Sequence, residues 1–212
     1  MRCARELLKA GQVRHDGPRY LLGIVGPPAV GKSTFAASLV AAVNRLAGDG
    51  MAVAVPMDGF HLPNVVLEAS GLRHLKGVPA TFDAQGFVDL LSRLRENPPR
   101  TLWCPLYDRD LHDRVDAALA VEPAARLIVV EGNYLLLTEP PWDQVRPKLD
   151  LAWYLDAPRG TRLERLRQRH VAGGRTLDEA QDKISGTDAP NAELIEATRT
   201  RSDRVIWLGA GT

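Results

Sequence analysis

The chain has 212 residues, of which 45% are apolar and 25% are charged, and its 27 basic side chains almost balance its 26 acidic ones. This composition is ordinary for a soluble globular protein with one well-buried core. The near-zero net charge argues against a nucleic-acid groove or an anionic membrane surface, so we expect no nucleic acid and no membrane among the partners. No apolar stretch approaches the length of a transmembrane helix.

The beginning of the chain and its two cysteines bear on the compartment. Charged residues interrupt the apolar ones over 1–10, which is not the pattern of a secretory signal. Cys3 and Cys104 form no metal-type cluster, and reduced thiols are a better interpretation than a disulfide, which their number alone would permit. We therefore expect a cytoplasmic protein.

The first predicted strand and helix enclose a phosphate-binding motif. The apolar run 20–25 predicts a buried strand, and 34–43 predicts a helix. Between them, residues 26–33 read GPPAVGKS and match G-x-x-x-x-G-K-S/T, the P-loop. A glycine-rich turn that binds nothing is the alternative, but the flanking strand and helix favour nucleotide binding. The residues assigned to it are Gly26, Pro27, Pro28, Ala29, Val30, Gly31, Lys32, Ser33 and Thr34.

Each part of this motif has a chemical role. Gly26 and Gly31 let the backbone turn tightly, so that consecutive N–H groups face an anion. The positive end of the next helix dipole points at the same place. Lys32 would reach the outer phosphates and act in catalysis, and the Ser33 hydroxyl would hold Mg²⁺.

A second strand, predicted over 51–57, leads into Asp58. A carboxylate there faces the same crevice as the P-loop, because ligands in such sheets bind outside the carboxyl ends of the strands. Asp58 could take the proton from an attacking hydroxyl or ligate Mg²⁺ through water, and an N-cap or turn aspartate is the alternative. His61 is a candidate substrate contact, although a loop histidine is more often an ordinary polar contact.

A helix over 84–96, closed by the Asn-Pro-Pro of 97–99, and a short strand over 101–104 come next. The segment 105–114 then gathers groups that recognise polar ligands. Tyr107 and His112 can stack or form hydrogen bonds, and an arginine such as Arg114 can clamp an anion through two hydrogen bonds. A solvated polar loop is the alternative.

Glu131 ends a buried strand predicted over 126–131. P-loop proteins hold the Mg²⁺ coordination water with an acid at this point, so Glu131 is a candidate metal residue. A cap of the next element is the alternative. Another buried strand is predicted over 149–155.

An arginine-rich helix is predicted over 159–171 and is broken by two glycines at 173–174. Arg165 and Arg169 are four residues apart and share a face, where like charges repel unless an anion lies between them. A lid closing over the transferred phosphoryl group would supply that anion, and a solvated helix face is the alternative. The remaining predicted elements are helices over 176–184 and 191–199 and a last strand over 204–208.

The alternation of strands and helices predicts the fold class. It is typical of a parallel α/β sheet with helices on both faces. A single domain over 1–212, with a small helical lid at about 162–176, is the simplest organisation.

Several motifs resemble those of one family when they are taken in order. The P-loop is followed by DGFHLPN at 58–64, GVPATFD at 77–83, PLYDR at 105–109, VEGNYLL at 130–136 and the arginine-rich helix. This order resembles the phosphoribulokinase/uridine kinase family of P-loop kinases over nearly the whole chain. The motif at 58–64 is similar to the corresponding motif of bacterial pantothenate kinase. Tyr107-Asp108 with His112 and Arg114 is similar to the pattern of uridine kinase. The combination, with Arg169-His170 and the APNA of 189–192, is most similar to the nucleoside/nucleotide kinase-like or fructose transport system kinase subgroup.

The resemblance implies a P-loop kinase fold and an enzyme that uses ATP and Mg²⁺ to phosphorylate a hydroxyl of a small metabolite. The acceptor would be a sugar, a nucleoside or a pantothenate-like alcohol. Asp58 would be the catalytic base, and Glu131 would assist Mg²⁺. The resemblance also places three lid arginines on phosphates, namely Arg165, Arg169 and Arg175. Of these, Arg169 would be catalytic. The residues that it places around the acceptor are Phe82, Asp83, Tyr107, His112 and Arg114.

Two other functions stay open as alternatives. A P-loop regulatory NTPase would have no small-molecule acceptor; a GTPase, however, would carry an N-K-x-D signature, which the sequence lacks. A nucleic-acid-binding ATPase is disfavoured by the charge balance. The sequence does not set the oligomeric state, and a homodimer stays open.

Overall fold

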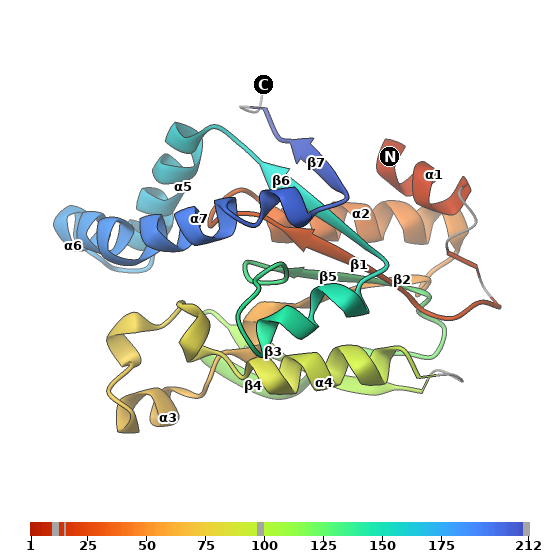
Figure 1. Ribbon diagram of the computed structural model, residues 1–212, viewed down its shortest axis with the longest axis horizontal. Coiled ribbons are helices and arrows are strands. Elements are labelled where there is room, and N and C mark those ends of the chain that lie inside the picture. Colours follow the sequence, from red (N-terminus) through yellow and green to blue (C-terminus); the bar gives the residue numbers. More distant parts are fainter. Residues whose placement is uncertain (10–12, 15, 97–99, 210–212) are drawn as a thin grey trace.

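A computed structural model of the protein describes residues 1–9, 13–14, 16–96 and 100–209. Its centre is a five-stranded parallel sheet with the strand order β2-β5-β1-β6-β7 (Figure 1). The strands are β1 (Tyr20–Val25), β2 (Ala52–Pro56), β5 (Leu127–Gly132), β6 (Leu151–Asp156) and β7 (Arg204–Trp207). All five were predicted from apolar runs, and their bounds agree with the prediction to within two residues.

Helices cover both faces of the sheet, as predicted. Successive side chains of a strand point to opposite faces, so Leu22 and Ile24 pack on one side, with Leu21 and Val25 on the other. The first side is covered by α1 (Arg2–Lys9) and α2 (Lys32–Ala47), and the second by α4 (Ala84–Leu94) and α7 (Ala189–Glu196). The helix predicted over 84–96 corresponds to α4. The Asn-Pro-Pro of 97–99, which was predicted to end that helix, lies outside the described residues.

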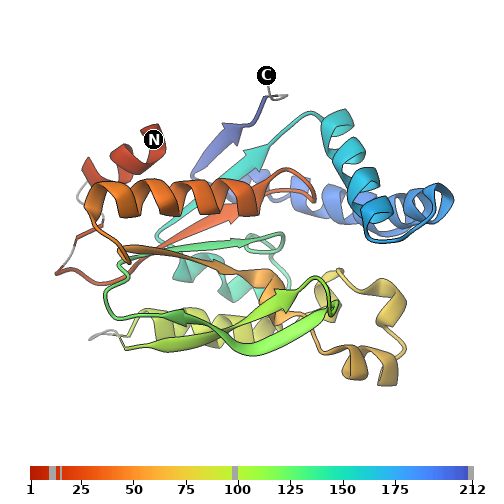
Figure 2. The same ribbon diagram turned by 180° about the vertical axis from the view of Figure 1, so that it is seen from behind.

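The short strand predicted at 101–104 is part of a larger element. β3 (Leu102–Asp108) pairs antiparallel with β4 (Asp113–Val121), and this hairpin forms a sheet of its own (Figure 2). The segment 105–114 is therefore the distal half of a hairpin, not an isolated loop. The hairpin contacts η1 (Met57–Phe60), the turn that follows β2, and thereby fixes the position of Asp58.

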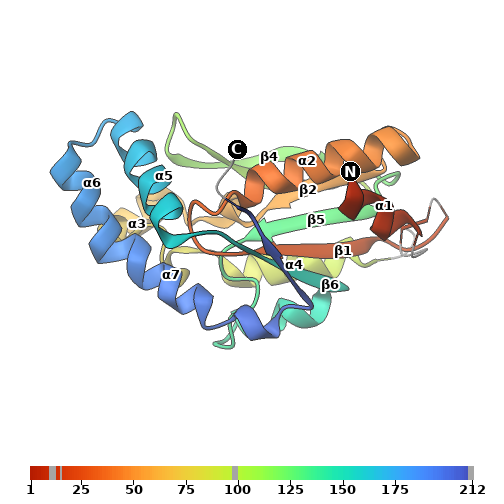
Figure 3. The same cartoon turned by 90° about the horizontal axis from the view of Figure 1, so that it is seen from above.

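The helices after β6 gather beyond one end of the sheet. α5 (Arg159–Ala172) is followed by α6 (Leu177–Lys183), a π-helical turn at Ile184–Asp188, and α7, which returns along the sheet (Figure 3). The sequence predicted the three helices of this region, over 159–171, 176–184 and 191–199, but it did not predict the π-helical turn, and it also missed α3 (Asn64–Ala69). None of the described helices is long and apolar enough to cross a membrane.

Candidate active site

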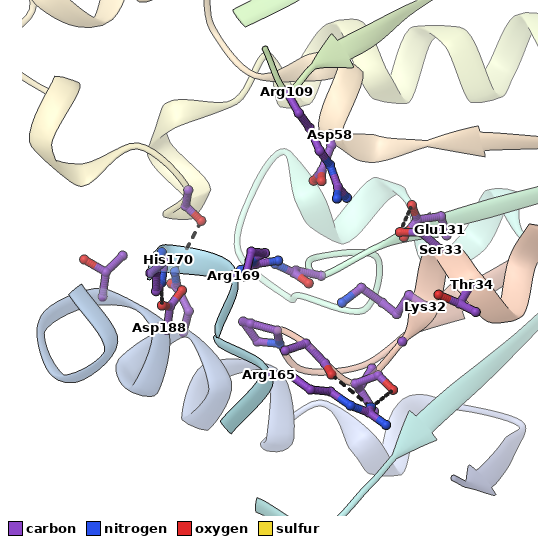
Figure 4. Close-up of a pocket in the computed structure, with 18 of the residues that line it drawn as sticks. Lys32, Ser33, Thr34, Asp58, Arg109, Glu131, Arg165, Arg169, His170 and Asp188 are labelled. Atoms are coloured by element: carbon purple, nitrogen blue, oxygen red, sulfur yellow. Dashed lines mark hydrogen bonds and ion pairs between the residues drawn. The ribbon is translucent and has the colours of Figure 1, made fainter. Parts of the chain in front are cut away.

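A cleft of about 820 Å³ lies outside the carboxyl ends of the parallel strands. The P-loop, η1, the end of β5, and α5 to α7 all contribute to its lining. The structure brings many of the predicted site residues together there (Figure 4). These are Pro28, Ala29, Val30, Gly31, Lys32, Ser33, Thr34, Asp58, His61, Phe82, Glu131, Arg165 and Arg169.

The P-loop has the tight backbone that anion binding requires. A Cβ at Gly26 would lie 2.5 Å from the carbonyl oxygen of Leu155, and Gly31 has a φ of +104°. The Lys32 ammonium donates hydrogen bonds to the carbonyl oxygens of Gly26 at 2.9 Å and Pro27 at 3.2 Å, so the lysine folds over the loop. Burial lowers the pKa of Lys32 to about 8, against the opposing effect of the Glu131 and Asp58 charges.

Ser33 and Glu131 form an oxygen pair beside the P-loop. The Ser33 hydroxyl donates a 2.9 Å hydrogen bond to Glu131 Oε1, and burial raises the pKa of Glu131. Within the described part of the chain, His, Cys, Asp and Glu side chains form no cluster of three or more that could hold a metal ion. One hydroxyl and one carboxylate fit Mg²⁺, which keeps several waters and takes further oxygens from phosphates.

Asp58 is carried by η1, directly after β2. Its side chain is exposed to the cleft, which Arg109, from the turn of the hairpin, also lines (Figure 4). The neighbouring Gly59 permits this placement, because a Cβ there would lie 2.1 Å from the carbonyl oxygen of Pro105. The close approach of the hairpin to η1 therefore requires glycine at 59.

An aromatic wall lies beside Asp58. His61 Nδ1 is 2.7 Å from the Asp58 carbonyl oxygen, and the His61 and Phe82 ring centroids are 4.0 Å apart. Tyr107 packs on His61 at 4.8 Å and is not among the residues that line the cleft. Burial lowers the pKa of His61, so the ring tends to be neutral.

The other predicted acceptor residues lie outside the lining of the cleft. Asp83 caps α4 by accepting a 2.9 Å hydrogen bond from the Gly86 N–H. Arg114 pairs with Asp116 at 2.6 Å, and His112 is an exposed residue of the hairpin turn. The predicted phosphate contact Arg175 is also exposed, in the turn after α5.

Arg165 and Arg169 share the face of α5 that meets the P-loop. Arg165 Nη1 lies 3.4 Å from the carbonyl oxygens of Ala29 and Val30. Arg169, one turn further on, points into the cleft toward Lys32 (Figure 4). The arginine-rich helix therefore lies over the phosphate-binding loop.

Comparison with known proteins places the chain in a family, although no family model matches it. The Schizosaccharomyces pombe protein named "Putative uridine kinase" is 34% identical over 209 residues, covering 96% of this chain and 86% of that protein. The chain belongs to the phosphoribulokinase/uridine kinase-like family of P-loop kinases. The crystal structure of a "putative fructose transport system kinase" from Silicibacter sp. has a TM-score of 0.86 and 35% identity and covers 97% of both chains. Vibrio cholerae pantothenate kinase is 32% identical over 148 residues, 67% of this chain and 47% of its own.

This P-loop kinase is a small-molecule kinase that uses ATP with Mg²⁺. Its cleft has a further wall that sequence reasoning did not assign. We call it the π-turn wall; its residues are Lys183, Thr187, Asp188 and Asn191. His170, on α5, also lines the cleft, and its Nε2 lies 2.6 Å from Asp188 Oδ2. Only the unusual APNA segment and His170 pointed to this region in the sequence, because a π-helical turn leaves no periodic signal.

Proposed function

We propose that this kinase transfers the γ-phosphoryl group of ATP to a hydroxyl of a sugar, a nucleoside or a pantothenate-like alcohol. The observation that carries the proposal is the position of Asp58. Asp58 is exposed in the cleft that holds Lys32, and its backbone carbonyl oxygen lies 2.7 Å from His61, whose ring packs on Phe82. An acceptor resting on this aromatic wall would have its hydroxyl between a proton acceptor and the phosphate-binding loop.

Each residue then has a defined task. Asp58 takes the proton of the acceptor hydroxyl as its oxygen bonds to the γ-phosphorus, and the bond to the β-phosphate oxygen breaks to release ADP. Lys32 and Arg169 stabilise the charge on the transferred group, while the P-loop N–H groups, Thr34 and Arg165 hold the other phosphates. Ser33 and Glu131 would hold Mg²⁺, which supplies charge neutralisation when bound.

We also propose that α5 and the turn through Arg175, about 162–176, act as a lid. The contacts of Arg165 with Ala29 and Val30 support this role, because the hydrogen bonds by which they join α5 to the P-loop are long, at 3.4 Å. Arg175, exposed here, would reach the phosphates on closure.

The test measures ADP release by the purified protein with ATP, Mg²⁺ and one alcohol at a time. The panel is D-ribose, D-fructose, uridine, D-glycerate and pantothenate. We expect at least one of them to stimulate ADP release, and Asp58→Asn to lower kcat by about 100-fold with little change in the KM for ATP. Asp49→Asn, at an exposed turn, is the matched control and should leave both constants unchanged. ADP release that no alcohol stimulates would favour a regulatory NTPase.

A further inference from the structure

The π-turn wall faces the cleft from the side of α6 and α7. Lys183 ends α6, and Thr187 and Asp188 belong to the π-helical turn itself. The turn therefore directs a charged pair, Lys183 and Asp188, at the same space. π-helical turns are rare and occur frequently at functional sites.

Asp188 has one oxygen free for a ligand. It is only 8% exposed, and His170 Nε2 holds its Oδ2 at 2.6 Å. No described residue donates a hydrogen bond to Asp188 Oδ1, although a carboxylate oxygen can accept two hydrogen bonds. The residue lines the cleft next to His170 (Figure 4). A ligand that donates hydrogen bonds would complete the pairing of this carboxylate.

Lys183 offers the complementary group. Its ammonium reaches only the carbonyl oxygens of Lys76 at 3.3 Å and His74 at 3.5 Å, and it lies within 4 Å of no carboxylate in the described chain. Burial lowers the pKa of Lys183, and the charge of Asp188 opposes that effect. Lys183 can therefore donate to a ligand oxygen that lies between it and Asp188.

Lys76, which also lines this end of the cleft, is already engaged by protein groups. Lys76, the other cation there, donates to Asn64 Oδ1 at 2.6 Å and to the His112 carbonyl oxygen at 2.7 Å, and it lies 3.8 Å from Asp113. Its charge and its donors are thus used within the protein. Among the described residues, the π-turn wall itself therefore carries one cation and one anion, with no surplus cation for a carboxylate or phosphate of the acceptor.

We propose that Asp188 and Lys183 bind a vicinal diol of a neutral acceptor, a sugar or a nucleoside, at hydroxyls that do not react. One hydroxyl donates to Asp188 and the other accepts from Lys183, while His170 positions the carboxylate. The inference rests on the proposed phosphotransferase function and narrows its acceptor. A site built to hydrogen-bond hydroxyls rejects analogues that lack them, because its own polar groups are then unpaired.

The experiment compares kcat/KM for two matched pairs, uridine with 2′,3′-dideoxyuridine and D-ribose with 2-deoxy-D-ribose. The wild-type kinase is expected to prefer the diol-bearing member of at least one pair by about 10- to 100-fold, the range for hydrogen bonds to charged groups. Asp188→Asn and Lys183→Met should each remove most of that preference and leave the KM for ATP unchanged. A residue with a merely structural role would not change this ratio.

Two control variants carry the same substitutions at exposed residues. Asp182→Asn, exposed beside Lys183, and Lys9→Met, exposed on α1, should keep the wild-type preference. If both Asp188→Asn and Lys183→Met keep the wild-type preference for the diol, the inference is overturned. It is also overturned if only D-glycerate or pantothenate is phosphorylated, although the proposed kinase function would then still hold. If no alcohol is phosphorylated, the proposed function fails and the inference fails with it.

Discussion

Replacing Lys32 with methionine should stabilise the unliganded protein while it abolishes phosphoryl transfer. Burial lowers the pKa of Lys32 from its ordinary 10.5 to about 8. Each pKa unit corresponds to about 1.4 kcal/mol, so holding the ammonium in the folded state at neutral pH costs about 3 kcal/mol. The side chain is partly open to the cleft and donates to Gly26 and Pro27, which reduces the gain. We expect Lys32→Met to raise the free energy of unfolding by about 1–2 kcal/mol at pH 7.

The pH dependence gives the sharper check. Between pH 8 and 10.5 the unfolded chain keeps the Lys32 proton that the folded protein has released, so wild-type stability rises with pH in that window. The difference in the free energy of unfolding between the variant and the wild type is therefore greatest below pH 8 and decreases toward pH 10.5. Urea unfolding followed by tryptophan fluorescence at pH 7 and pH 10 measures both quantities, with the exposed Lys9→Met as control. A variant no more stable than wild type at pH 7, or a pH-independent difference, would refute the reasoning.

Three further predictions concern single residues. Arg169→Ala should lower kcat more than it raises the KM for ATP, whereas Arg167→Ala, at an exposed residue, should change neither constant. If steady-state kinetics show the same effect for both variants, Arg169 does not act on the transferred phosphoryl group. Glu131→Gln should raise the Mg²⁺ concentration for half-maximal activity by about tenfold or more, and an unchanged Mg²⁺ titration would place the metal elsewhere. Gly59→Ala should destabilise the protein by about 1–3 kcal/mol in urea unfolding, because its Cβ meets the Pro105 carbonyl. Unaltered stability would mean that the hairpin shifts freely.

The sequence alone determined the sheet and the phosphate-binding half of the site. Strands buried on both faces are continuous apolar runs, and the P-loop glycines, Lys32 and Ser33 lie within one local motif. Asp58 and Glu131 were also predictable, because each follows a strand and parallel strands end at a common edge. That both line the same cleft as the P-loop depends on little beyond chain order.

Only the tertiary structure decided which residues form the proposed acceptor side of the cleft. Tyr107 and His112 lie in a segment rich in ligand-binding groups, yet the hairpin register places Tyr107 behind His61 and His112 at an exposed turn. Asp188 reaches His170 across 18 residues, through a π-helical turn that leaves no periodic signal in the sequence. These contacts depend on how separate segments pack, and packing energies between distant residues are not contained in the local pattern of either segment.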